Sequence, residues 1–348
     1  MHRSLQYLAV VLLILPAWAY GQTPVPHTQA SQAKYAGEFI AIGVGGRALG
    51  LGGAYTALAN DVTAGYWNPA GLAAIAYPEV ALMHDERFGG LVNYDYGAVA
   101  VPVGPKSTLA LSVIRLGVDD IANTTSAWVG DLNGNGLPDA NEIDYSKITS
   151  FNASEWAFYL SYAREVSNQF SYGGNIKLLR HRIGGAAATG IGFDVAARYR
   201  CTERLTLGAN FQDVTTTLVA WNNGTNELIT PTLKLGSAYA IDAFGGRFSP
   251  VFDTDVRFEG RKSASNAHIG RVSFDFHAGL EYDVRNLVAL RAGYSDIGSF
   301  NAGAGIHLPK LDIDYSFAKF NGTEQLDNTH RISLTFILQA EQYARSVE

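Results

Sequence analysis

One polar stretch carries enough oxygen-bearing residues, suitably spaced, to hold a metal ion. It reads GDLNGNGLPDANEID over residues 130–144. Counted from Asp131, positions 1, 3, 5, 7, 9 and 12 of a calcium-binding loop fall on Asp131, Asn133, Asn135, Leu137, Asp139 and Glu142. Ca²⁺ accepts roughly 6–8 oxygen ligands in loose geometry, and this is the spacing of an EF-hand loop, with a glycine at the bend. We therefore expect a Ca²⁺ site here.

The same stretch departs from the usual loop in ways that leave an alternative open. Its flanks read as strands rather than helices, Pro138 removes one backbone N–H, and asparagine stands at two positions where aspartate is common. The stretch is therefore similar to the solitary calcium loops of exported bacterial proteins, which bind at about 10⁻⁴–10⁻³ M. The alternative is a run of Asx-turns without metal. In either case the role would be to fix a long loop.

Other chemistry-bearing residues do not assemble into a catalytic pattern. From position 84 onward the histidines are scattered, without a metal-ligand spacing: His84, His181, His268, His277, His307 and His330. Ser273 and His277 share one predicted strand without a recognisable nucleophile motif. A formal net charge of −6 gives no electrostatic case for nucleic acid, and a single cysteine, Cys201, excludes a disulfide framework. We expect no enzyme.

The N-terminus has the form of a signal peptide. His2 and Arg3 precede an apolar run, Leu8 to Ala19, which ends in Ala-Trp-Ala. This run is too short for a spanning helix, so residues 1–21 are predicted to be removed after export. No later stretch approaches the roughly 20 consecutive apolar residues that a membrane helix needs.

From about position 79 onward, the dominant pattern has a period of two. In VFDTDVRFE, residues 251–259, apolar and polar side chains alternate, as they do in a strand with one buried face. About fourteen such strands begin near positions 79, 92, 107, 154, 169, 190, 204, 232, 250, 270, 287, 300, 311 and 329. Many of them reach roughly 10 residues, the length of a tilted membrane strand. The alternative is a soluble β-sandwich, but its strands are usually shorter.

The connections between these strands alternate between short turns and longer polar loops. This is the plan of a bacterial outer-membrane barrel, because lipid cannot satisfy a free strand edge. We therefore predict an all-β fold, a closed antiparallel outer-membrane β-barrel of about 14 strands over residues 77–338. The polar faces would line the lumen and the apolar faces would meet lipid. The N-terminus, the short turns and a C-terminal tail, residues 339–348, would face the periplasm.

A glycine-rich stretch precedes the barrel. Residues 38–50, EFIAIGVGGRALG, suggest a dinucleotide-binding turn, but no βαβ unit follows. Instead, Arg47-Ala48-Leu49-Gly50 through Asp61 and Tyr66-Trp67-Asn68-Pro69-Ala70-Gly71-Leu72 resemble the N-terminal signature of PorV/PorQ-type outer-membrane proteins, a branch of the FadL-like fourteen-stranded barrels. The resemblance implies that residues 22–76 form a plug or periplasmic segment. Its motif residues would be Arg47, Gly52, Gly53, Asp61, Asn68, Pro69 and Ala70.

Two interpretations of this motif remain open. Asn68-Pro69 would be a structural turn, in which Asn68 bonds nearby backbone, or part of a gate as in FadL-like transporters. Arg47 would pair with a lumenal carboxylate or remain solvated at the mouth of the barrel.

The resemblance also implies a function. PorV-like barrels work with type IX secretion, so we expect an accessory of protein export, with the translocon and its cargo as partners beside outer-membrane lipid. The long loops at residues 118–153 and 213–231, which include Trp221, would be the docking surface. The alternative is a FadL-like transporter that admits hydrophobic small molecules past a movable plug.

Overall fold

The computed structural model describes residues 37–137, 139–260, 265–295, 298–319 and 328–345. The chain divides into two units, Met1–Lys34 and Tyr35–Glu348, and all described residues belong to the second. The predicted signal peptide and the first part of the predicted plug, residues 22–36, lie outside the described residues. Within the described ranges, no helix is long and apolar enough to cross a membrane.

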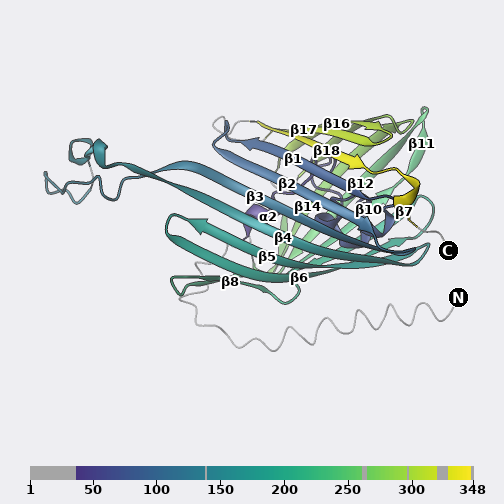
Figure 1. Ribbon diagram of the computed structural model, residues 1–348, viewed down its shortest axis with the longest axis horizontal. Helices are drawn as coiled ribbons and strands as arrows, with labels where there is room; N and C mark the ends of the chain where they lie inside the picture. The colour runs from purple at the N-terminus through teal and green to yellow at the C-terminus, as the bar shows by residue number, and fades with distance from the viewer. Residues whose placement is uncertain (1–36, 138, 261–264, 296–297, 320–327, 346–348) are drawn as a thin grey trace. The chain divides into compact units, whose positions relative to one another are not determined.

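Fourteen strands of the described chain form one antiparallel sheet that closes on itself (Figure 1). The first seven are β1 (Glu79–Arg87), β2 (Val92–Pro102), β3 (Ser107–Asn123), β4 (Thr149–Ser167), β5 (Phe170–Ile183), β6 (Ala186–Arg200) and β7 (Leu205–Gln212). The other seven are β10 (Thr232–Tyr239), β12 (Gly246–Arg257), β14 (Val272–Val284), β15 (Val288–Tyr294), β16 (Phe300–Leu308), β17 (Leu311–Lys319) and β18 (Thr329–Ile337). Pairing of β1 with β18 closes the barrel, so its edges are hydrogen-bonded as a membrane requires.

Four shorter strands extend this framework: β8 (Thr217–Trp221), β9 (Asn226–Ile229), β11 (Ile241–Ala243) and β13 (Ala267–Ile269). The β8–β9 hairpin pairs with β6, whereas β11 and β13 pair with β12 and β14. The prediction of a closed barrel of about 14 strands is confirmed, and eleven of the fourteen predicted strand starts lie within two residues of the observed ones.

The connections alternate only in part as predicted, because Gly184 and Gly185 alone join β5 to β6 where we expected a longer loop over residues 181–189. The β2–β3, β4–β5 and β16–β17 connections are tight turns, whereas β3 and β4 extend far beyond the barrel at the opposite end (Figure 1). That extension carries the 3₁₀ helices η3 (Ala140–Glu142) and η4 (Tyr145–Lys147). In bacterial outer-membrane barrels the short turns face the periplasm. We call the other end, with the long loops, the outer end.

The outer wall of the barrel is apolar. Side chains that alternate with the buried ones remain exposed, including Leu111 at 57% and Phe158 at 43%. Across β1 to β6 such residues lie in directly paired positions: Leu82, Gly97, Val113, Phe158, Leu178 and Ile191. An apolar exterior on a closed barrel is suited to acyl chains, and it places the chain in a bacterial outer membrane.

The inner wall has two unlike halves. Along β1 to β4 the inward side chains are mainly small or aromatic: Ala81, Met83, Tyr94, Tyr96, Ala98, Ala100, Ala110, Ile114, Ala157, Tyr159 and Ala163. Along β12 to β18 they are mainly polar, and seven of them are charged: Asp253, Asp255, Asp275, Glu281, Arg291, Asp314 and Arg331. We call these the apolar half and the charged half of the lumen.

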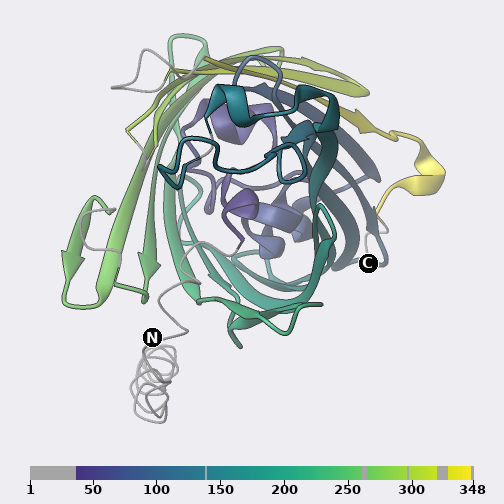
Figure 2. The ribbon, with the colours of Figure 1, turned by 90° about the vertical axis from the view of Figure 1, so that its left-hand side faces the viewer.

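The glycine-rich segment lies inside the barrel. Figure 2, which looks in from the outer end, shows its short helices within the ring of strands. They are α2 (Glu38–Ala41), α3 (Gly46–Gly50), α4 (Ala64–Trp67) and the 3₁₀ helix η2 (Pro69–Ala74). We call residues 37–76 the plug. After β18 the described chain ends with η6 (Glu341–Tyr343) and Arg345.

Candidate functional site

The plug crosses the lumen from the outer end to the short-turn end. At its start, Phe39 packs edge-on against His181 near the outer end of β5, with ring centroids 5.3 Å apart. At its end, the carbonyl of Ile75 accepts a hydrogen bond from Nη2 of Arg345 at 2.6 Å. The same Nη2 donates to Thr108 near the periplasmic end of β3. We expected the chain before the barrel to face the periplasm, but the described start of the plug lies at the outer end.

Apolar packing holds the plug against one half of the lumen. Tyr66 and Trp67 of α4 contact each other edge-on, and Tyr66 also meets Tyr159 of β4, with centroids 6.2 Å apart. Leu51, Tyr55 and Leu72 are fully buried. Each buried side chain of this size contributes about 1.5–3 kcal/mol when it leaves water. The plug therefore has a core of its own, shared with the wall.

Arg47 of α3 fixes the plug to the charged half. Its Nε donates to Oε2 of Glu281 at 2.9 Å, and its Nη2 donates to Oε1 at 2.8 Å. Arg291 of β15 donates to the same carboxylate at 2.7 Å and to Asp314 at 2.5 Å. Burial disfavours the charged guanidinium of Arg47, and the carboxylates of Glu281 and Asp61 compensate for that burial. Arg47 thus pairs with a lumenal carboxylate through a bidentate fork.

Asp61 folds the plug onto itself. Its Oδ1 accepts a hydrogen bond from the backbone N–H of Thr63 at 2.9 Å, and its Oδ2 accepts one from the hydroxyl of Tyr55 at 2.6 Å. Arg47 Nη1 lies 3.8 Å from the same carboxylate. Asp61 therefore links the middle of the plug to the helix that meets the wall.

Asn68, Pro69 and Ala70 form the anchor of the plug's last turn. Asn68 is extended, with φ −160°, and Pro69 begins η2 directly after it. The side chain of Asn68 accepts a hydrogen bond from the N–H of Ala70 at 3.1 Å and donates to the carbonyls of Thr56 at 2.8 Å and Ala197 at 3.2 Å. This is an Asx-turn that also ties two legs of the plug to β6. A gating role for the motif stays a hypothesis.

Gly52 and Gly53 bring the plug backbone against the wall. Both have positive φ, 68° and 83°, and a Cβ on Gly52 would lie 2.7 Å from the backbone of Tyr294. The carbonyl of Gly52 also lies 2.8 Å from Nδ1 of His277. A side chain at Gly52 would thus be strained and would collide with β15, which explains glycine at this position.

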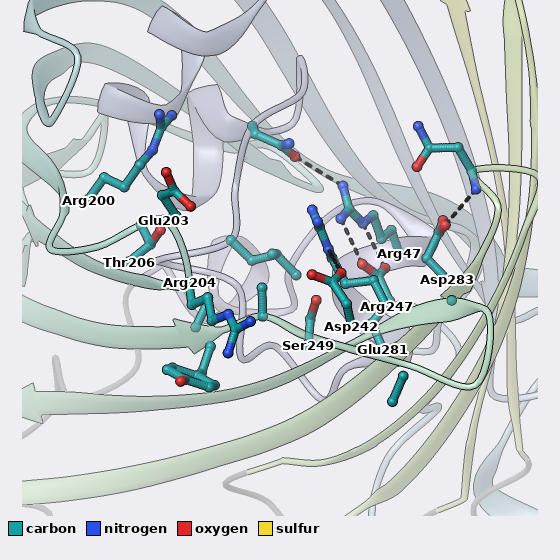
Figure 3. Close-up of a pocket in the computed structure, with 18 of the residues that line it drawn as sticks. Arg47, Arg200, Glu203, Arg204, Thr206, Asp242, Arg247, Ser249, Glu281 and Asp283 are labelled. Atoms are coloured by element: carbon teal, nitrogen blue, oxygen red, sulfur yellow. Dashed lines mark hydrogen bonds and ion pairs between the residues drawn. The ribbon is translucent and has the colours of Figure 1, made fainter.

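Two cavities flank the plug, and the charged half of the lumen forms part of the lining of each. The inner cavity, about 930 Å³, opens at the short-turn end and is lined by Arg47, Arg198, Arg200, Arg204, Arg247 and Glu281 among others (Figure 3). The outer cavity, about 210 Å³, lies beyond the plug and is lined by Leu49, Gly52, Arg87, Lys234, Asp255 and Arg331 among others. The lumen is therefore interrupted by the plug and not filled throughout.

The predicted calcium loop lies at the far end of the β3–β4 extension, remote from the plug. Asp131 accepts hydrogen bonds from the backbone N–H groups of Gly134 and Gly136, at 2.7 and 2.8 Å. The side-chain amides of Asn133 and Asn135 both donate to Asp139. The N–H of Leu137 donates to Asn135 at 2.7 Å.

Glu142 closes this loop. It is fully buried and accepts hydrogen bonds from the N–H groups of Leu132 at 2.7 Å and Asp139 at 3.2 Å. Desolvation opposes its ionisation, but these backbone hydrogen bonds outweigh it and lower the pKa of Glu142. Among the described residues, no group of three or more His, Cys, Asp or Glu side chains is placed to hold a metal. Pro138 lies outside the described residues. The Ca²⁺ site stays a prediction.

Comparisons with known proteins bear on the fold. A family model described as "Uncharacterised protein family (UPF0164)" matches residues 19–92. No curated protein matches the chain. The Ralstonia pickettii toluene transporter TbuX is 12% identical, with a TM-score of 0.58, over 85% of this chain and 98% of that chain. The P. putida toluene transporter TodX is 14% identical, with a TM-score of 0.57, over 86% and 99%. A Pseudomonas aeruginosa FadL homologue is 15% identical, with a TM-score of 0.55, over 90% and 99%.

The barrel is FadL-like. The prediction of an accessory to type IX secretion is wrong, because the solved structures that share this fold are small-molecule transporters and channels. The resemblance of the plug motif to PorV/PorQ-type proteins misled us, because such a motif reports how a plug packs in a barrel and not what passes through it. These structural similarities favour the alternative from the sequence, a FadL-like transporter of hydrophobic small molecules.

Sequence reasoning missed two sets of residues in this FadL-like barrel. Inward glycines of the wall receive the plug backbone: Gly173, Gly208, Gly236, Gly279 and Gly293. Their signal was present, because glycine inside a strand often marks close approach of another backbone. The second set is Lys177, fully buried, with its Nζ 2.8 Å from Asp194 and 2.7 Å from Asp213. The alternation of β5 is a signal that would place Lys177 in the lumen, but it does not identify the partners of Lys177.

Proposed function

We propose that this protein is a FadL-like outer-membrane transporter that admits hydrophobic small molecules past its plug. The observation that carries the proposal is the plug itself, which packs its apolar side chains along the apolar half of the lumen. Solved structures with the same fold, among them two toluene transporters, support this class of ligand. In this proposal the protein has no enzymatic activity, and its lasting partner is outer-membrane lipid.

The apolar half offers the route. If the plug moves away from β1 to β4, it uncovers a wall of small and aromatic side chains, including Tyr94, Tyr96 and Tyr159. Such surface favours apolar ligands, because transferring apolar area from water contributes about 25 cal/mol per Å². The plug and a ligand would therefore compete for the same surface. The hydrogen bonds of Asn68 and the ion pair of Arg47 set the opposing cost of moving the plug.

A disulfide can test whether plug movement is needed. A Cβ on Gly65 of α4 would lie 3.8 Å from Cβ of Ser161 on β4, which is close to the mean of about 3.8 Å in disulfides. The double variant Gly65→Cys/Ser161→Cys, made in a Cys201→Ser background, should therefore cross-link the plug to the wall. We expect oxidation to abolish uptake of toluene or a hydrophobic fluorescent probe, and reduction to restore it.

The two single-cysteine variants in the same background are the matched controls, since neither can form the bond. Their uptake should not respond to oxidant. Uptake by the cross-linked protein at the rate of the reduced protein would refute a moving plug. Equal uptake by cells with and without the wild-type protein would refute transport altogether.

A further inference from the structure

The two lumen cavities carry more cations than anions. Around the outer cavity, four cationic side chains face two acidic ones: Arg87, Lys234, Arg257 and Arg331 against Glu38 and Asp255. Around the inner cavity, six arginines face four acidic side chains: Arg47, Arg198, Arg200, Arg204, Arg247 and Arg285 against Glu203, Asp242, Glu281 and Asp283. In the outer cavity, Asp85 and Asp275, just outside the lining, pair with Arg331 and Arg257. The electrostatic preference for anions is therefore clearest in the inner cavity.

In the outer cavity, two guanidinium groups have a buried nitrogen without a hydrogen-bond partner among the described residues. Arg331 is 4% exposed, and its Nε donates to Asp85 at 3.1 Å. Nη1 of Arg331 and Nη1 of Arg87 have no hydrogen-bond partner among the described residues. A small anion in the cavity could accept hydrogen bonds from these two nitrogens.

In the inner cavity, the arginines lie at the mouth. Arg247 is paired with Asp242 at 2.8 Å, and Arg47 is paired with Glu281. Arg200 and Arg204 lie together on one side of the cavity (Figure 3), and they form no ion pair among the described residues. Their guanidinium groups are thus available to a solute that enters from the periplasmic side.

One short element separates the two cavities. Arg47 of α3 lines the inner cavity, whereas Leu49, Gly52 and Gly53 line the outer one. On the wall, His277 lines the outer cavity and Glu281 the inner one, and four residues of strand span about 13 Å. The barrier is therefore α3 with the turn that follows it. The Arg47–Glu281 pair holds it to the wall, and the backbone N–H groups of Tyr55 and Thr56 add hydrogen bonds to Asp253.

We propose that the two cavities are parts of a second pathway, which conducts small anions when α3 leaves the wall. Chloride or phosphate would pass from Arg87 and Arg331 at the outer end to Arg200 and Arg204 at the inner end. The Arg47–Glu281 pair closes this pathway. The inference needs no hydrophobic ligand, so it stands or falls separately from the transport proposed above.

Conductance in planar bilayers tests it. The purified mature protein is inserted into a neutral lipid bilayer with a tenfold KCl gradient. We expect wild-type protein to remain mostly closed, and Arg47→Ala to raise the open fraction at least tenfold with a reversal potential of anion-selective sign. Gly279→Ala provides a second way to loosen α3, because its Cβ would lie 2.7 Å from the carbonyl oxygen of Leu51.

Charge substitutions then test the lining. In the Arg47→Ala background, Arg200→Glu should weaken or reverse the anion preference. Arg182→Glu makes the same charge change on an exposed residue of β5 outside both cavities, and it should leave selectivity unchanged. Cation-selective currents, equal effects of the two glutamates, or absence of current from both opening variants would each overturn the proposal.

Discussion

A single methyl group on the wall should displace the plug. Gly279 and Gly293 are directly paired on β14 and β15, and both face inward against Leu51. A Cβ on Gly293 would lie 2.1 Å from the carbonyl carbon of Leu51 and 2.3 Å from the nitrogen of Gly52. These atoms are backbone, so no side-chain rotation relieves the contact. Gly293→Ala is therefore expected to push the turn after α3 out of its recess.

The size of the effect follows from the geometry. Ordinary van der Waals contact begins at 3.4 Å, so the backbone at Leu51 must retreat by about 1.3 Å, the difference between 3.4 and 2.1 Å. Overpacking of this kind costs about 1–3 kcal/mol. If the cost falls on the seated state of the plug, the displaced population rises about 5- to 150-fold.

Proteoliposomes loaded with a small anionic dye report this population as a leak rate. Gly97→Ala is the matched control, because Gly97 faces outward on β2 and its Cβ would lie 3.5 Å from the nearest side-chain carbon of Val113. We expect the leak to rise for Gly293→Ala and to remain at the wild-type rate for Gly97→Ala. Equal leak rates for all three proteins, each correctly folded, would refute the view that this recess seats the plug.

Three further outcomes are expected. Asn68→Ala removes the hydrogen bonds that the Asn68 amide donates to the buried carbonyls of Thr56 and Ala197, which costs about 1–3 kcal/mol. It should therefore lower the melting temperature in detergent. An unchanged melting temperature would contradict the view that Asn68 anchors the plug. Lys177→Met leaves Asp194 and Asp213 facing each other without a cation, so urea titrations should show a loss of about 3–5 kcal/mol in the free energy of unfolding. If asparagine also replaces both aspartates in the Lys177→Met background, the loss should be smaller, because no buried charge remains. Ca²⁺ should protect the β3–β4 extension from proteolysis with a midpoint of about 10⁻⁴–10⁻³ M, and Glu142→Gln should remove that protection; cleavage that ignores Ca²⁺ would leave the Asx-turn alternative.

The barrel was predictable from sequence because alternation and turn spacing are local signals. Residues 251–259 alternate in the sequence, and Asp253 and Asp255 are indeed buried in the lumen. The strand starts at positions 79, 92 and 107 coincide with those of β1, β2 and β3. A period of two also fixes which face of a strand meets lipid, because a slip of one residue would expose the charges.

The site was less predictable because its contacts join residues that are far apart in the chain. Arg47 and Glu281 are 234 positions apart, and no local pattern states which lumenal carboxylate an arginine will reach. The direction in which the plug crosses the lumen could not be predicted from sequence either, because a segment of short helices has no periodicity that relates it to the strands. Function was the weakest inference, because it rested on a motif of the plug and not on the surfaces along which a solute would move.

The two halves of the lumen lead to one prediction that separates the proposed pathways. The Gly65–Ser161 cross-link would attach α4 to β4 on the apolar half, whereas Arg47 holds α3 to β14 on the charged half. In a protein that combines Gly65→Cys/Ser161→Cys with Arg47→Ala, oxidation should stop uptake of the hydrophobic probe and leave the chloride current. Loss of both together would mean that the plug moves as one rigid piece. In that case the lumen has a single gate, and its two faces do not act separately.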